Sequence, residues 1–196
     1  MATTITSIRG LQNLNNLELF SADFHSLQTV NLSGLTNLLT VDISDNLTLD
    51  GSSKSLTSVN LSGCTALQQL RLDDSDFSAG IPNFTGLVNL DTLDMDQCDI
   101  TGSIDLSMLS SLNYLDLNGN TDLTSVTIPV SNLDSVYIYD TALTEAAVND
   151  ILQRLDNNGI TGGNVELDGG TSAAPTGAGI TAKDNLIAKF WSVSTN

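Results

Sequence analysis

The feature that most constrains the fold of this chain is a set of aliphatic residues that recurs at nearly regular intervals. The pattern LxxLxLxx, followed in most copies by a small polar residue or cysteine, occurs six times, at separations of 24, 29, 23, 22 and 21 positions. The copies begin at Leu14, Leu38, Leu67, Leu90, Leu112 and Leu133. Such self-similarity indicates that one small unit is stacked on the next, because a single unit cannot bury its own apolar face.

Each unit contains two apolar segments that are about 11 residues apart. In the main segment, alternate residues such as Val41 and Ile43 are predicted to point inward, as in a half-buried strand. A second, weaker series lies between the main copies and comprises Leu27, Val30, Leu32, then Leu56, Val59, Leu61, and Leu123, Val126, Ile128. We therefore expect a strand on one side, a turn, and an opposing extended segment, with one aliphatic layer between them.

Several segments resemble leucine-rich-repeat proteins of bacterial and bacteriophage type. The stretch 56–72 is similar to the short, cysteine-containing repeats of internalin-like surface proteins. The segments 77–82 and 100–104 resemble the LxGxIP turn of the plant-type class. The resemblance covers residues 8–143 and implies an α/β solenoid with a parallel β-sheet on one side and short extended or turn segments on the other. It carries little information about function, because this fold recognises many unrelated partners.

In this family, an asparagine after the strand hydrogen-bonds the backbone of neighbouring repeats. Here only Asn46 and Asn120 keep that residue, so the ladder is incomplete. Cys64 and Cys98 fall at turn positions and have no CxxC or CxxH spacing. They are therefore predicted to be buried free thiols rather than zinc ligands or a disulfide.

The last 53 residues are predicted to close the C-terminal end of the solenoid. Thr144 fits the N-cap of a helix that ends near Gly159, and Val165 marks a following strand. After a loop over 169–179, we expect a helix from Thr181 and a last strand at 191–193. The segment resembles a capping unit of bacterial and phage repeats, in which glycine often precedes the tryptophan; Phe190 stands there in this chain. Residues 1–143 and 144–196 thus form a solenoid and its cap, in one continuous domain.

The N-terminal end has no comparable capping pattern. Ile5, Ile8 and Leu11 are expected to form an irregular first coil, and Phe20 and Phe24 to cover its open edge.

Outward positions of aligned strands stack into rows about 4.8 Å apart, so the register predicts the exposed face. Its three rows read Asn16, Thr40, Gln69, Thr92, Tyr114, Ser135; Glu18, Asp42, Arg71, Asp94, Asp116, Tyr137; and Phe20, Ser44, Asp73, Asp96, Asn118, Tyr139. The middle of this face is acidic, and Asp74 adds to it, whereas all three tyrosines lie toward the C-terminal end. The candidate partner-binding residues are Asp42, Arg71, Asp73, Asp94, Asp96, Asp116, Tyr114, Tyr137 and Tyr139.

Two interpretations of this face remain open. The aspartates form either a solvated surface or a site for a cation, and Asp94 with Asp96 is the best pair for Ca²⁺. Because no DxDxDG loop is present, we predict no metal site and no cofactor. The tyrosines suit contact with a protein or glycan, since a tyrosine ring offers flat area and a polar tip; alternatively they only contact the capping helix.

Charge and motifs narrow the function. The net charge of −17 disfavours binding to nucleic acid or to anionic lipid. No apolar run reaches the roughly 18 residues of a membrane span, and the first residues lack a signal-peptide core. A virion or cell-surface location without a signal peptide is expected, or a cytoplasmic one if the chain is not assembled. No GxSxG, HExxH or P-loop motif occurs, so we expect no enzyme.

The sequence thus predicts a recognition module that binds a protein or glycan, in adhesion or receptor contact on a phage virion or bacterial surface. The alternative is a structural or decoration subunit that contacts virion proteins or copies of itself. A carbohydrate-active enzyme is a more distant alternative.

Overall fold

A computed structural model describes residues 4–130 and 132–196 of the chain. Residues 1–3, at the start of the predicted first coil, and residue 131 lie outside the described residues. The described part is built mainly from parallel β-sheet with a few helices, which confirms the α/β class.

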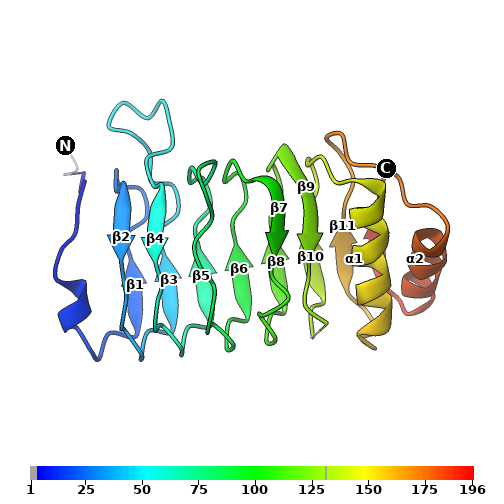
Figure 1. Cartoon of the computed structure of the whole chain (residues 1–196), viewed down its shortest axis with the longest axis horizontal. Helices are drawn as coiled ribbons and strands as arrows, with labels where there is room; N and C mark the ends of the chain where they lie inside the picture. The colour runs from blue at the N-terminus through cyan, green and yellow to red at the C-terminus, as the bar shows by residue number, and fades with distance from the viewer. Residues whose placement is uncertain (1–3, 131) are drawn as a thin grey trace.

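The main sheet has eight strands, and their order in the sheet is the order in which they occur in the chain. Each strand pairs in parallel with the next. Figure 1 shows these strands following one another along the long axis of the molecule. The strands are β1 (Leu19–Ser21), β3 (Thr40–Asp42), β5 (Gln69–Arg71), β6 (Thr92–Asp94), β8 (Tyr114–Asp116), β10 (Ser135–Tyr137), β11 (Asn164–Glu166) and β12 (Ser192–Ser194).

Between main-sheet strands the chain crosses to the opposite side, where two small parallel sheets form. One pairs β2 (Thr29–Asn31) with β4 (Ser58–Asn60), and the other pairs β7 (Thr101–Asp105) with β9 (Asp122–Thr127). We call the stretch from one main-sheet strand to the next a layer. The half-way aliphatic series of the sequence falls on these strands, with Val30 directly beside Val59.

The core is a continuous stack of aliphatic side chains between the two sides. The central residue of each main strand from β3 to β10 is fully buried; these residues are Val41, Leu70, Leu93, Leu115 and Val136. They lie side by side in the register of the sheet, so each side chain packs on the one before it. The predicted inward column is therefore confirmed from the second copy onward.

The predicted turn asparagines have the expected structural role. The Asn46 amide donates to the carbonyls of Ala22, Ile43 and Ser44, and its oxygen accepts the Leu27 N–H. Asn120 does the same three layers further on. These bonds tie adjacent layers together where the sheet hydrogen bonds end. Both cysteines are buried free thiols, as predicted.

The register predicted for the first copy is wrong. Leu17, Phe20 and Ala22 occupy the inward positions, whereas Leu14 and Leu19 are 49% and 61% exposed. The 3₁₀ helix η1 (Leu11–Asn13) precedes this segment, and its Leu11 is buried. Phe20 thus belongs to the core, and Phe24, which was expected to cover the edge, is 71% exposed.

The C-terminal segment forms the elements that the sequence predicts. Helix α1 (Glu145–Asn157) begins after Thr144, whose hydroxyl accepts the Ala147 N–H. Helix α2 (Ala178–Ala188) starts three residues before the predicted Thr181 and packs against α1. Strand β12 completes the main sheet, directly after the buried side chain of Trp191.

Candidate binding face

The candidate site is the outward face of the main sheet, which we call the binding face. The register places Thr40, Gln69, Thr92, Tyr114 and Ser135 in one row. The next row contains Asp42, Arg71, Asp94, Asp116 and Tyr137. Backbone hydrogen bonds beyond the strand ends continue this order and bring Asp73, Asp96, Asn118 and Tyr139 into a third row. These rows agree with the sequence prediction from β3 onward.

At the N-terminal end of the face, the predicted first members of the rows are wrong. Leu19 and Ser21 pair with Thr40 and Asp42 and take the positions predicted for Asn16 and Glu18. Asp23 takes the position predicted for Phe20, because the Phe24 N–H bonds to Ser44. The correction follows from the shifted first copy and leaves every candidate binding residue in place.

The acidic residues gather most closely around β5 and β6. Carboxylate oxygens of Asp73, Asp94 and Asp96 lie within 4.8 Å of one another. A second group, made of Asp45, Asp73 and Asp74, shares one member with the first. We call these five residues the acidic cluster. The sequence identified Asp94 with Asp96 as the best pair for a cation, and the structure adds Asp73 as a third carboxylate.

The acidic cluster is electrostatically strained because it is only partly solvated. Burial, together with the charges of Asp94 and Asp96, raises the pKa of Asp73 to about 7. Burial and the neighbouring Asp116 raise the pKa of Asp94 to about 6. Arg71 is the nearest cation, with its Nε 3.7 Å from the Asp94 carboxylate, and half of its side chain is exposed. One such contact offsets only part of the repulsion among several carboxylates.

Asp94 differs from its neighbours in the row because one of its oxygens lacks a partner. Its side chain is 13% exposed, and its Oδ1 is buried without a hydrogen bond within the described residues. Asp42 instead accepts the Ser44 hydroxyl at 2.7 Å, and Asp116 accepts the Asn118 amide at 2.6 Å. Asp94 is therefore the carboxylate of this row that gains most from an external donor.

The tyrosines form the C-terminal part of the binding face. The rings of Tyr114 and Tyr137 are tilted by 44° with centroids 5.5 Å apart, and the Tyr114 hydroxyl donates to Asp116 at 3.2 Å. Burial and the nearby charge of Asp116 raise the pKa of the Tyr139 hydroxyl above its ordinary value. Helix α1 packs against β9, in the sheet on the opposite side. The ring pair thus belongs to the sheet face, and this arrangement does not favour the alternative of contact with the capping helix.

A row of residues with a left-handed backbone conformation runs along the acidic cluster and shares Asp45 and Asp74 with it. Sequence reasoning missed this row. The residue that follows the third row has a positive φ in every layer; the row comprises Phe24, Asp45, Asp74, Gln97, Gly119, Asp140 and Gly169. Aspartate and glycine tolerate this conformation better than most residues. The signal was available in the repeat, since each position lies one residue before the turn asparagine or its substitute.

Beside this row lies an open depression of about 470 Å³. The loop 51–54 forms one wall, and Asp74, Asp76 and Asp99 form the other. Lys54 reaches across it and pairs with Asp99 at 2.7 Å. The loop belongs to the longest of the early layers, where an insertion after β3 gives the repeat its 29-residue spacing. The depression thus extends the acidic cluster toward the edge of the face.

Comparison with known proteins gives no further assignment: no family model matches the chain, and no curated protein matches it significantly. In the part of the chain that the structure describes, neither helix has the length and apolar character needed to cross a membrane.

Proposed function

We propose that the chain is a leucine-rich-repeat solenoid that acts as a non-enzymatic recognition module and binds a protein through the binding face. The proposal depends chiefly on one observation: a tyrosine ring pair lies on the same face as half-buried carboxylates with raised pKa values. Aromatic anchors next to polar groups that need a partner are typical of recognition surfaces.

The chemistry of the face favours a partner with exposed arginine or lysine. A guanidinium can lie over the ring of Tyr114 or Tyr137 while it donates to Asp94 or Asp116. It would supply the donor that Asp94 Oδ1 lacks and would lower the repulsion within the acidic cluster. A neutral glycan could stack on the same rings but would leave that repulsion in place.

The biological setting follows from the resemblance alone. Internalin-like repeats and a cap of bacterial and phage type suggest adhesion or receptor contact on a virion or on a bacterial surface. In that setting the binding face would contact a receptor protein, or a glycan as the weaker choice.

Binding to two defined probes tests the proposal. An arginine-rich peptide of about ten residues and an array of neutral glycans are offered to the wild type and to the double variant Tyr137→Ala/Tyr139→Ala. We expect the peptide to bind the wild type and the double variant to weaken this binding by about tenfold or more. Asp94→Asn should weaken binding of the peptide and leave any glycan binding unchanged.

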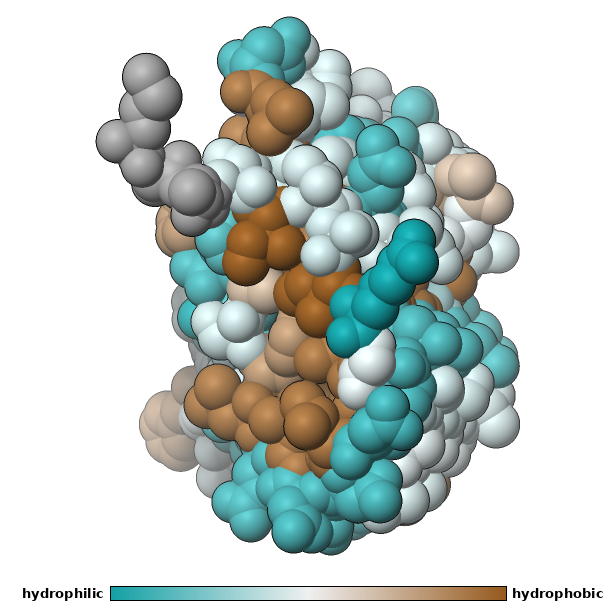
Figure 2. All heavy atoms as spheres, turned by 90° about the vertical axis from the view of Figure 1, so that its left-hand side faces the viewer, coloured by the Kyte–Doolittle hydropathy of each residue, from teal (hydrophilic) through white to brown (hydrophobic). Residues whose placement is uncertain are grey.

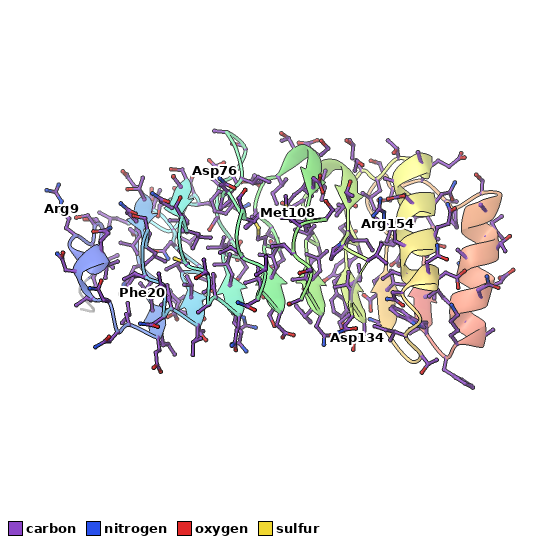
Figure 3. The ribbon with its side chains drawn as sticks, turned by 60° about the horizontal axis from the view of Figure 1, so that its bottom comes forward. Arg9, Phe20, Asp76, Met108, Asp134 and Arg154 are labelled. Carbon is purple, nitrogen blue, oxygen red and sulfur yellow. The ribbon has the colours of Figure 1, made fainter. Side chains whose placement is uncertain are left out.

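A matched control is Met108→Ala, because Met108 is also an exposed apolar residue and lies in the turn after β7 (Figure 3). Binding of this variant should equal that of the wild type. If the peptide binds all variants equally, its attraction is general charge and the face is not the site. If neither probe binds at any concentration, the proposed partner chemistry is wrong.

A second candidate function is a structural subunit of a virion or another assembly. It is favoured by the apolar side chains that are exposed at the N-terminal end of the described residues.

A further inference from the structure

At the N-terminal end of the part that the structure describes, several apolar side chains are exposed to solvent. Ile5, Leu14, Leu19 and Phe24 are 41%, 49%, 61% and 71% exposed. Figure 2, which views the molecule from this end, shows a hydrophobic area running through its middle between hydrophilic margins. We call these four residues, with the free edge of β1, the N-terminal end surface. Contiguous exposed apolar patches on soluble proteins commonly mark interaction sites.

The same surface offers unused backbone hydrogen-bonding groups. Strand β1 is the first strand of the main sheet and, within residues 4–130 and 132–196, pairs only with β3. The N–H groups of Ala22 and Phe24 and the carbonyl of Glu18 bond to the second layer. Because backbone groups alternate along a strand, those of Leu19, Ser21 and Asp23 point to the free edge. An extended partner strand would find three matching donors and acceptors there.

Charge indicates what kind of partner can reach this end. The first 54 residues, which form this end and the loop beside it, contain two basic and five acidic side chains, for a net charge of −3. The other 142 residues contain four basic and 18 acidic ones, a net charge of −14. A second copy of this chain therefore meets less repulsion at the N-terminal end than over the rest of the surface.

We propose that two copies of the chain associate through their N-terminal end surfaces, with the two β1 strands antiparallel across a two-fold axis. In this arrangement Ser21 lies opposite Ser21 of the second copy, and Leu19 lies opposite Asp23. The free N–H and C=O groups of all three residues then pair. In an antiparallel sheet, the two residues of a hydrogen-bonded pair each donate their N–H to the other's carbonyl. The apolar side chains of both ends are covered at the same time, and the symmetry closes the assembly at two copies.

This inference goes beyond the proposed recognition function and does not depend on it, since the candidate binding residues, which lie from β3 onward, stay open on both copies. A head-to-tail arrangement, with β1 against the free edge of β12, would instead extend without closing. The two arrangements predict different masses.

The test is the molar mass by analytical ultracentrifugation of the full chain from about 1 µM to about 1 mM, the range of weak to moderate association. We expect the wild type to rise from one chain to two and to stop there. Leu19→Glu places a carboxylate opposite Asp23 of the second copy and should raise the dissociation constant by about tenfold or more. Val88→Glu makes the same change at a residue that is 50% exposed between β5 and β6, and it should dimerise like the wild type.

Phe24→Gly gives a second variant that cannot fail merely by misfolding, because glycine suits the φ of 55° at this position. It too should weaken the dimer, and Gln97→Gly, at the equivalent position two layers past β3, should not. A wild type that stays a single chain throughout overturns the proposal. So does a mass that grows beyond two, or a dimer that Leu19→Glu and Val88→Glu affect equally.

Discussion

The two ends of this molecule differ in how the hydrophobic core is covered. A stack of layers exposes its core at both ends, and each end requires a cover. At the C-terminal end, α1, α2 and β12 extend the stack and close it. At the N-terminal end the cover is one turn of 3₁₀ helix and an irregular segment, and Leu14 and Leu19 stay exposed. Among the described residues, the C-terminal end is thus covered, whereas the N-terminal end leaves apolar side chains exposed.

The C-terminal cap and the N-terminal segment also differ in how many contacts hold them to the rest of the molecule. Trp191 is 4% exposed, its indole N–H donates to the Ile160 carbonyl at 3.1 Å, and its ring packs against Gly163 so closely that a Cβ there would lie 2.6 Å away. Lys189 ties α2 to Asp156 at the end of α1. The N-terminal segment is linked to the first layer by few bonds, such as the one that the Ser26 N–H donates to the Ile5 carbonyl. Cooperative unfolding should accordingly include the C-terminal cap but not the N-terminal segment.

The sharpest test of this comparison is to delete the largest buried side chain at each end. Trp191→Ala removes an indole that fills the space between the last strand and the helices, and it should lower the free energy of unfolding by about 4 kcal/mol. Phe20→Ala should cost about half as much, because the first layer can open by itself. Urea denaturation monitored by circular dichroism gives both values. Equal losses, or a larger loss at Phe20, would contradict the comparison.

The second test uses pH, because the strained carboxylates lie between the two ends. The folded-state pKa values of Asp73 and Asp94, about 7 and about 6, lie above the ordinary value for aspartate. Their contribution to stability is therefore complete below the unfolded pKa and is lost as pH rises through the folded values. We expect stability to increase by about 2 kcal/mol between pH 8 and pH 5, after allowance for solvent screening.

Hydrogen exchange locates this effect and supplies its control. Amides of β5, β6 and β8 should gain protection at pH 5 relative to pH 8, once intrinsic exchange rates are corrected for. Those of β1, two strands away from β5, should gain less. Asp94→Asn should raise stability at pH 8 by about 1 kcal/mol and reduce the pH dependence, since it removes one of the repelling charges. A stability that falls from pH 8 to pH 5 would show that the cluster is not strained.

The sequence predicts the strand register correctly from the second copy onward and wrongly in the first copy, for a physical reason. Leu38, Val41 and Ile43 define a unique register because layers on both sides require these positions to be apolar. Among the described residues no main-sheet strand precedes the first copy, so Leu14 and Leu19 fit the pattern as well as Leu17 and Phe20 do. The choice between them depends on how η1 packs, which a repeat pattern does not contain.

The candidate site shows a similar division. Its rows follow from the spacing of the strands, and every candidate binding residue is on the predicted face. The spacing does not reveal that Asp94 is nearly buried with one oxygen unpaired, or that Tyr114 donates to Asp116. Those properties arise from side-chain packing between layers.

The smallest expected effect concerns two phenylalanines held in the left-handed conformation, one at each end. Phe190 has a φ of 66° and follows α2, where the Trp191 N–H bonds to the Leu186 carbonyl, a helix ending that favours glycine. Because its side chain is 84% exposed, Phe190→Gly should raise the free energy of unfolding by about 0.5 to 1 kcal/mol.

Phe24→Gly relieves a similar conformation at the other end, where φ is 55°. If the first layer opens independently, the stability gained there should slow local exchange of β1 amides and leave the global unfolding free energy unchanged. Measurement is best made at low concentration, where the chain is monomeric, so that lost association does not mask the gain. Should Phe24→Gly raise the global value as much as Phe190→Gly does, the N-terminal layer must unfold together with the rest, and the two ends would be equally well secured.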